Sequence, residues 1–466
     1  MAGYLGIWAA ATGRIRRAYW QEILFVMVAT NAGAWFDTSA LVTTVSNFPG
    51  ARGKVVGVLK SFVGLSSAVF TAQYSGFFAP SADAFLLYLA VSITVVAPAL
   101  GVLLNRVPLP IANAPRTPLR WATLYCCVLL TSAYLATNSV VGNVVDESKA
   151  TKRALTLTLL ALLAPAVAVV IGTGPLVYKV DVDPEDSLKA LGPGDSAEYE
   201  YEASELAQPL LDSDAEEGGL SQGGSSSAPF AERGLSACLR SADYWLLFAT
   251  CAVGMGSGLV LNNNIAQIVQ ALGGPADGQD VFVSLYSVGN CVGRLLGGVG
   301  SQWLLQRHGV PRPACLVAAV TLCVPVNLAL AFFPSLGVLY PAALLAGTSF
   351  GGFWGVMPAC TSEIFGLKSF ASNYSFLQLA AAIGSYGMAM QLASRTYDAA
   401  PSDPSPPMAP PPSPGPAGAP VCYGDECFRV AFLVAAALTL VGVVTGAALT
   451  RLTRGGYAAL RGKALS

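Results

Sequence analysis

The residues of this chain that could do chemistry lie mostly inside apolar stretches, and one of them is an acid. Asp37, in the segment ATNAGAWFDTSALV, is the only carboxylate well inside such a stretch. Helical spacing puts Asn31 and Thr38 on one face of a helix, with Trp35 and Asp37 near that surface. A carboxyl group in this setting could couple proton binding to a conformational change. It could equally be a packed polar residue that keeps some hydration.

A second ionisable residue, Arg294, lies near the centre of the apolar stretch 281–305. An unpaired guanidinium that faces lipid is too costly in free energy to be left without a partner. Glu363, at the end of another stretch, is the natural partner for Arg294 or Arg307, and we expect a gating salt bridge there. The alternatives are direct contact between Arg294 and an anionic substrate, or a permanent structural ion pair.

Amides and tyrosines in the later stretches are typical of residues that line a polar route. Each could hydrogen-bond a substrate, and each could instead pack against a neighbouring helix. Lys60, a turn or two inside its stretch, is expected to extend its ammonium group to the membrane surface. The candidate substrate-contacting residues of this kind are Asn262, Asn263, Gln267, Tyr286, Tyr374 and Gln378.

The ten cysteines are scattered, and most fall in apolar stretches, where they read as small buried residues. Cys422 and Cys427 differ, because they bracket Tyr-Gly-Asp-Glu in a polar loop and could form a disulfide if that loop faces an oxidising compartment. The chain has no C-x-x-C pair, no nucleophile beside a base and no phosphate-binding loop. We therefore expect neither an enzyme nor a metal or cofactor site.

The composition indicates a membrane protein. Hydrophobic residues make up 54% of the chain and charged residues 11%, against about 25% charged in an ordinary soluble domain. Mean hydropathy is +0.56. So much apolar surface cannot be buried in one soluble core, and we expect it to face a lipid bilayer. The formal net charge of -1 provides no basic field, which excludes nucleic acid as a partner.

Crossing a bilayer core of about 30 Å takes roughly 20 apolar residues as helix. The sequence predicts an all-α, polytopic protein, with glycines at four-residue spacing for close helix contact at Gly293, Gly297, Gly347, Gly351 and Gly355. The eleven predicted spans are 20–45, 55–78, 84–104, 121–141, 154–178, 244–268, 281–305, 314–333, 336–361, 370–394 and 428–449.

Two regions interrupt the spans. Residues 179–241 are acidic and rich in Gly and Ser, which predicts a disordered linker, and residues 399–420 form a proline-rich loop. Lys and Arg are more frequent in the short loops on the linker side, so the linker and the C-terminus are predicted to be cytoplasmic. The predicted domains are an N-terminal bundle 1–178, a C-terminal six-helix bundle 242–454 and a tail 455–466.

The segment PACTSEIFGLKSFASNYSFLQLAAAIGSYGMAMQLASRTYD, residues 358–398, resembles the signature P-T-x-S-E-x-F-G-L-K-x-F-x-x-x-Y-N-F of plant nodulin-like members of the major facilitator superfamily. Ser375 stands where that family prefers Asn. Residues 30–62 are similar to the family's N-terminal domain from what would be its fourth helix. The matching residues of the signature are Pro358, Ser362, Glu363, Phe365, Gly366, Leu367, Lys368, Phe370, Tyr374 and Phe376.

The resemblance implies a facilitator-like fold of two bundles, of which the N-terminal one is expected to lack its first two helices and most of the third. Spans 121–141 and 154–178 look like the extra pair of fourteen-helix facilitators, and 4–12 like the stub of another helix. The implied function is secondary active transport, by alternating access, of a small polar or anionic organic solute, with protons as a candidate coupling ion. The alternative is a non-transporting membrane scaffold or sensor. We expect a monomer in the plasma or the vacuolar membrane.

Overall fold

The computed structural model describes residues 1–16, 18–48, 51–102, 117–142, 148–171, 230–275, 278–400 and 422–465. Within these ranges every regular element is a helix, which confirms the predicted all-α class. Nine of the described helices are long and apolar enough to cross a membrane. The chain is therefore a multi-pass integral membrane protein.

The N-terminal half begins with a short apolar helix that packs against the second and fourth helices. The third helix ends in a π-helical turn, η2, and Gly76 in that turn lies against Thr156 of the sixth helix. The elements are α1 (Ala2–Ala11), α2 (Tyr19–Asn47), α3 (Arg52–Gln73), η2 (Tyr74–Phe78), α4 (Ala82–Gly101), α5 (Thr117–Gly142) and α6 (Lys149–Ile171).

The described residues of the C-terminal half form six long helical segments, two of which are interrupted by π-helical turns. Its elements are α9 (Leu235–Cys238), α10 (Ala242–Ala271), α11 (Gln279–Leu295), η6 (Leu296–Gly300), α12 (Ser301–His308), α13 (Arg312–Phe332), α14 (Leu336–Ile364), α15 (Phe370–Leu377), α16 (Leu379–Gly384), η7 (Ser385–Leu392), α17 (Ala393–Ala399) and α18 (Glu426–Leu465).

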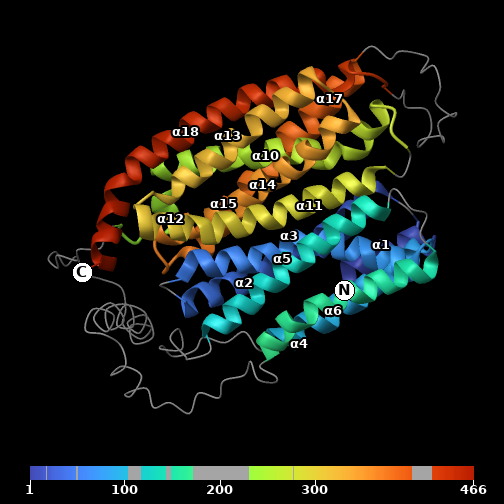
Figure 1. The fold of residues 1–466 in the computed structure, drawn as a ribbon, viewed down its shortest axis with the longest axis horizontal. Helices are drawn as coiled ribbons and strands as arrows, with labels where there is room; N and C mark the ends of the chain where they lie inside the picture. The colour runs from blue at the N-terminus through green and yellow to red at the C-terminus, as the bar shows by residue number, and fades with distance from the viewer. Residues whose placement is uncertain are drawn as a thin grey trace.

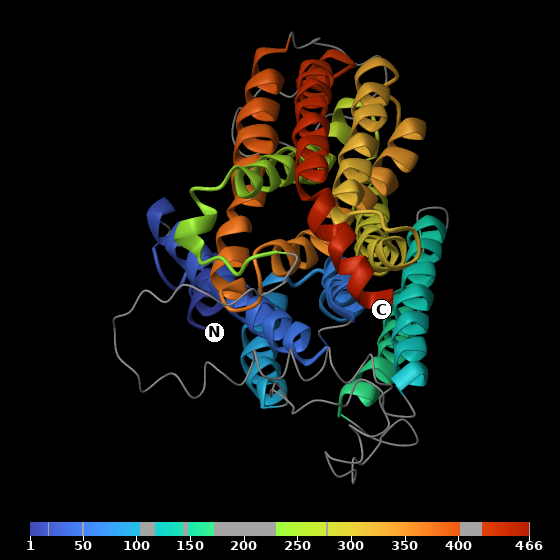
Figure 2. The same ribbon diagram turned by 90° about the vertical axis from the view of Figure 1, so that its left-hand side faces the viewer.

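The two halves meet along α3 and α11. In Figure 1 the helices of the C-terminal half, coloured from yellow-green to red, lie above those of the N-terminal half, and α11 is next to α3 at the boundary. Figure 2, from the side, shows the same division. The polypeptide chains approach closely there, because a Cβ added at Gly64 would lie 2.9 Å from Cys291 Cα, and one added at Gly57 would lie 3.1 Å from Gly298 Cα.

Glycines also set the contact between α11 and α14. A Cβ at Gly293 would overlap the carbonyl of Thr348, and a Cβ at Gly351 would overlap the carbonyl of Asn290. The two backbones are thus in van der Waals contact, as small residues at this spacing permit. This close pairing fixes which face of α11 turns toward α14, and with it the direction of the polar side chains between those glycines.

Within the described residues the eleven predicted spans fall on helical segments, and positions 103–104 and 172–178 of two of them lie outside those residues. Two of these segments are not among the nine candidates for crossing by length and hydropathy. Those two are α2 and the continuous segment Gln279–His308, formed by α11, η6 and α12. They carry Asp37 and Arg294, the two ionisable residues singled out from the sequence.

The predicted boundaries need two corrections. Residues 455–465, expected to be a tail, continue α18, because Tyr457 is buried and its ring packs edge-on against Phe230 at 5.4 Å. Residues 230–241, expected to belong to a disordered linker, are ordered and include α9. The rest of that linker, 179–229, and residues 401–420 of the proline-rich loop lie outside the described residues.

The ordered segment before α10 is fastened to the loop between α14 and α15. The Glu232 carboxylate accepts hydrogen bonds from the backbone N–H groups of Leu367, at 2.8 Å, and Lys368, at 3.2 Å. Arg233 donates to both carboxylate oxygens of Asp243, at 3.1 and 2.6 Å. We call the end of the molecule at which α10 begins and α14 ends the linker-side end.

Candidate functional site

A cavity of about 530 Å³ lies where α2 and α3 of the N-terminal half meet α11 and α14 of the C-terminal half. Most of its wall is apolar, with three charged side chains and one indole. It is lined by Gly33, Phe36, Asp37, Ala40, Leu41, Leu59, Lys60, Val63, Arg294 and Trp354.

The face that α2 turns toward the cavity includes Asp37 but not Asn31 or Trp35. The cavity-lining residues of α2 run from Gly33 to Leu41 at spacings of three and four, which is one face of a helix. Trp35 Nε1 donates to Asn31 Oδ1 at 2.8 Å, and Trp35 is 71% exposed. The sequence placed Trp35 and Asp37 near the face of Asn31 and Thr38. In the structure Asn31 and Trp35 lie outside the cavity wall, and Asp37 belongs to the neighbouring face.

Asp37 forms an ion pair with Lys60. Lys60 Nζ, on α3, lies 2.7 Å from Asp37 Oδ1 and 2.5 Å from Oδ2, and it also donates to the hydroxyl of Tyr374 on α15 at 2.8 Å. The Lys60 side chain is 3% exposed and that of Asp37 is 26% exposed. The expectation that Lys60 extends to the membrane surface is therefore wrong: its ammonium group turns inward, because an acid and a phenol are within reach there.

Arg294 is buried and has one hydrogen-bond acceptor among the described residues. Its Nε donates to Asn290 Oδ1, one turn earlier on α11, at 2.8 Å. The guanidinium carbon lies 5.5 Å from the ring centre of Trp354, and Lys60 Nζ lies 5.2 Å from the same ring. An aromatic ring attracts cations to its face, so Trp354 holds both cations near one wall of the cavity.

The charges around the cavity do not balance. Among the residues that the structure describes, one carboxylate, Asp37, and two cations, Lys60 and Arg294, line it. Because Asp37 is already engaged by Lys60 at hydrogen-bond distance, the positive charge of Arg294 is left over. A buried ion without a counter-ion costs several kcal/mol. The cavity therefore has an electrostatic preference for an anion.

Glu363 pairs with Arg312, so the expected pairing of Glu363 with Arg294 or Arg307 is wrong. Arg312 Nε lies 2.8 and 2.7 Å from the two carboxylate oxygens of Glu363, and the Arg312 side chain is 1% exposed. Arg307 lies in the last turn of α12, on the exposed surface. Arg312 follows Pro311 at the start of α13 and is thereby placed level with the end of α14, whereas Arg294 is near the middle of its membrane segment.

This ion pair belongs to a polar cluster that reaches the N-terminal half. The other guanidinium nitrogens of Arg312 donate to Ser301 Oγ, at 2.8 Å, and to Gln302 Oε1. Gln302 Oε1 also accepts from the backbone N–H of Gly53, at the start of α3, at 3.3 Å. Both members of the ion pair are on the C-terminal half, so the pair itself does not cross the junction; Gln302 does.

The remaining candidates do not line the cavity. Gln378 Nε2 donates to Thr38 Oγ1 at 3.5 Å, and Asn263 Nδ2 donates to Ser385 Oγ at 3.3 Å. The Tyr286 ring packs beside Phe350 at 6.0 Å. Asn262 is half-buried and Gln267 is exposed, both on α10. Of the sequence candidates, the structure gathers Asp37, Arg294 and Tyr374 in one place.

Three residues of this site were not selected from the sequence as site residues: Lys60, Asn290 and Trp354. Lys60 carried a usable signal, since a second ionisable residue within a span, opposite in sign to Asp37, indicates a partner. Trp354 gave none, because its value to the site comes from its position between two cations of other helices.

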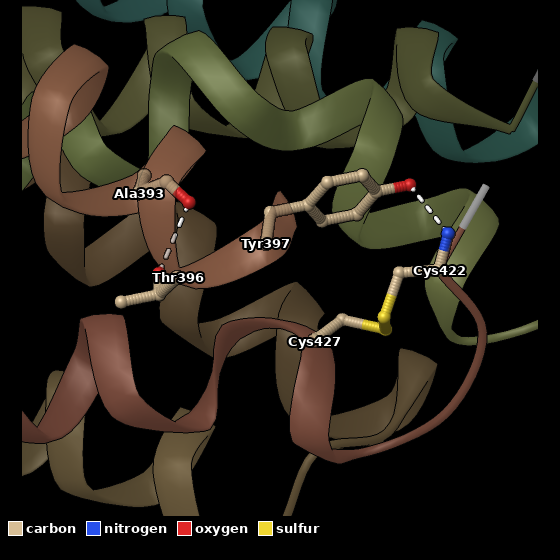
Figure 3. The surroundings of a disulfide bond; sticks show 5 residues. All are labelled: Ala393, Thr396, Tyr397, Cys422 and Cys427. Carbon is tan, nitrogen blue, oxygen red and sulfur yellow. Dashed lines mark hydrogen bonds between the residues drawn. A yellow bond between two sulfur atoms is a disulfide. The ribbon is translucent and has the colours of Figure 1, made fainter. Parts of the chain in front are cut away.

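Cys422 and Cys427 form a disulfide at the start of α18, with Cα atoms 5.9 Å apart. Figure 3 shows the Tyr397 side chain of α17 pointing to this ring, where its hydroxyl accepts from the Cys422 N–H at 3.0 Å. The backbone N–H of Gly424 donates to the carbonyl of Ala271, at the end of α10, at 2.9 Å. The ring thus joins the ends of three helices opposite the linker-side end.

Two family models match the chain. Residues 1–171 match the model described as Nodulin-like, and residues 229–401 match the NFD4 C-terminal domain. A relative, Protein NUCLEAR FUSION DEFECTIVE 4 of Arabidopsis thaliana, is 25% identical over 465 residues, which cover 96% of this chain and 75% of that protein.

Two solved structures are similar over most of their length. The transporter FucP, in its outward conformation, is 13% identical, with 96% of this chain and 97% of that chain covered and a TM-score of 0.34. A bacterial homologue of the lysosomal transporter Spinster, inward-facing, is 12% identical, with 91% and 98% covered and a TM-score of 0.35.

Proposed function

The chain belongs to the nodulin-like family, and on that premise we propose that it is a secondary active transporter that moves a small polar or anionic organic solute by alternating access. The observation that carries the proposal is the charged cavity at the junction of the halves, lined by α2 and α3 on one side and by α11 and α14 on the other. A site contacted by both halves is what alternating access requires, because one half must move past the solute that the other holds.

Asp37 is the proposed coupling residue. Its carboxylate faces Lys60 on the same half, and Lys60 in turn donates to Tyr374 on the other half. Protonation of Asp37 removes its negative charge and with it the attraction that holds Lys60 in place. The change alters a contact that crosses the junction, so proton binding and the relative position of the halves are linked.

The proposed orientation puts the linker-side end in the cytoplasm. The bias of Lys and Arg supports this, and so does the disulfide, which lies at the opposite end. Disulfides persist in oxidising compartments and are rare in the cytosol. The ring of Cys422 and Cys427 therefore faces the outside of the cell or an organelle lumen.

The test is solute uptake by full-length protein in proteoliposomes with an imposed pH gradient. A panel of labelled monocarboxylates, sugars and amino acids is offered, and internal pH is followed with an entrapped dye. We expect wild-type protein to take up at least one solute with simultaneous proton movement. In Asp37→Asn, uptake that depends on the pH gradient is expected to be lost.

Two further variants make the result interpretable. Glu426→Gln changes an exposed acid of the ion pair with Arg429 and should retain uptake. The double variant Asp37→Asn with Lys60→Gln removes both charges, so that a loss of uptake cannot be ascribed to a buried unpaired lysine. If folded wild-type protein moves none of the solutes with or without the gradient, the scaffold or sensor function replaces the transporter.

A further inference from the structure

The terminal nitrogens of Arg294 have no acceptor among the described residues. Its one hydrogen bond uses Nε, and the residue is only 5% exposed. Arg294 and Trp354 both line the cavity, and the guanidinium carbon lies 5.5 Å from the ring centre of Trp354. A buried, charged donor at a cavity wall that has no acceptor from the described protein residues is available to bind a ligand.

The charge count around the cavity sets the charge of the ligand. Lys60 and Asp37 neutralise each other, and Arg294 leaves one positive charge. A monoanion closes that balance, whereas a dianion would leave a buried negative charge and a cation would add to the excess. An uncompensated ion is costly where the dielectric constant is low, so the site should select a monoanion over a dianion or a cation.

The geometry of the group sets the chemical class. The two terminal nitrogens of a guanidinium form a planar fork that matches the two oxygens of a carboxylate. Asn290 Oδ1 accepts from Nε, and the guanidinium carbon lies 5.5 Å from the ring centre of Trp354, so these two contacts hold the fork in place before a ligand arrives. Ordering the group in advance lowers the entropy lost on binding.

The rest of the wall sets the body of the ligand. Phe36, Leu41, Leu59 and Val63 are apolar, and Gly33 and Ala40 leave room beside them. The volume of about 530 Å³ is within the range of small-molecule sites. An apolar body buried against this wall adds the hydrophobic contribution that a bare inorganic anion lacks.

We infer that the cavity binds a small organic monocarboxylate with an apolar body, its carboxylate held by the guanidinium fork of Arg294. This inference rests on the proposed transport function and names its substrate class. The Lys60–Asp37 pair lies beside the bound carboxylate, close enough for the two anions to compete for Lys60. The count of one leftover positive charge holds while Asp37 is ionised. Protonation of Asp37 releases Lys60 as a second cation, which strengthens the attraction for an anion and so links anion binding to proton binding.

The test separates binding from transport. Purified full-length protein is titrated with benzoate, phenylacetate and hexanoate, and each acid is paired with its neutral amide and read out by thermal unfolding. We expect at least one acid to raise the unfolding temperature while its amide does not, and phthalate, a dianion, to act less than benzoate. Arg294→Gln should lower the affinity of the protein for that acid on the order of 30-fold or more.

A matched series guards against misfolding. Arg294→Lys keeps the charge and loses the fork, so it should fold and bind with an affinity between those of wild type and Arg294→Gln. Arg429→Gln, at an exposed ion pair, should bind as wild type does. The inference is overturned if no acid stabilises wild-type protein more than its amide, or if Arg294→Lys and Arg294→Gln bind the acids as well as wild type.

The two proposals can fail independently. Arg294-dependent binding of an acid without uptake by vesicles would overturn the transport function and leave the carboxylate site. Uptake of neutral or cationic solutes with no preference for the acids would overturn the carboxylate site and leave transport.

Discussion

Lys60 and Asp37, on neighbouring helices of the N-terminal half, face each other across 2.5 Å at the edge of a cavity that also contains Arg294. Asp37 neutralises the positive charge of Lys60, and the positive charge of Arg294 remains without a counter-ion among the described residues. The same lysine is bonded to Tyr374 on the C-terminal half, so one ammonium group joins the acid of one half to the phenol of the other.

Replacing only one member of the ion pair of Lys60 and Asp37 should destabilise the protein more than replacing both. Lys60→Met leaves the Asp37 carboxylate without its cation and should cost about 3 kcal/mol of unfolding free energy, a typical value for one broken member of a buried pair. The double variant with Asp37→Asn should recover part of that loss. Denaturant unfolding of the four proteins of this cycle measures the coupling, and additive effects would show that the pair is not formed.

Breaking the buried ion pair of Arg312 with Glu363 from one side should destabilise the linker-side end. Glu363→Gln leaves a fully buried guanidinium with a weaker partner and should lower stability by about 3 kcal/mol or more. The control is Glu426→Gln at the exposed pair with Arg429, expected to cost less than about 1 kcal/mol. Equal effects of the two variants on thermal unfolding would contradict the burial of Arg312.

Adding one methyl group between α11 and α14 should be destabilising. In Gly351→Ala the new Cβ overlaps the carbonyl of Asn290, and relief by backbone movement should cost about 1–3 kcal/mol. Gly455→Ala in α18 is the control, because nothing lies within 4 Å of its Cβ. That variant should be neutral or slightly stabilising, since alanine is the better helix former. Unfolding temperatures in detergent measure both effects, and an unchanged unfolding temperature for Gly351→Ala would contradict the close contact.

The fastening of the segment before α10 should be visible in hydrogen exchange. Glu232→Gln replaces a carboxylate that accepts from two backbone amides with a neutral amide, so the N–H groups of Leu367 and Lys368 should exchange faster. Mass spectrometry of the peptide that spans these residues measures the rates. No change at this peptide, or an equal change in Glu426→Gln, would rule out the contact in solution.

The disulfide should protect its two cysteines from alkylation. Cys422 and Cys427 should react with a maleimide only after reduction. In sealed vesicles that keep the cytoplasmic side inside, a maleimide added to the outside should reach them. Cys422→Ser and Cys427→Ser should lower thermal stability by equal amounts, and the double variant by no more, because one bond is lost in all three. Unequal single effects that add in the double variant would show two independent thiols.

Several features of the fold could be predicted from residue types alone. A chain with 54% hydrophobic and 11% charged residues must bury apolar surface in lipid, and backbone hydrogen bonding then requires helices. The spans followed from this, and the four-residue spacing of glycines predicted the close helix contacts at Gly293 and Gly351. Asp37 and Arg294 were singled out for the same reason, since ionisable groups are expensive in a membrane wherever their partners lie.

The tertiary structure decided which acid pairs with which base. Lys60 reaches an acid 23 positions away, and Glu363 meets an arginine 51 positions away rather than Arg294. Charge alone permits several such pairings, because any acid attracts any base. The choice depends on how each helix is rotated about its axis and at what depth each residue lies, and both are set by packing over the whole bundle. Only then does Arg294 emerge as the cation left for a ligand.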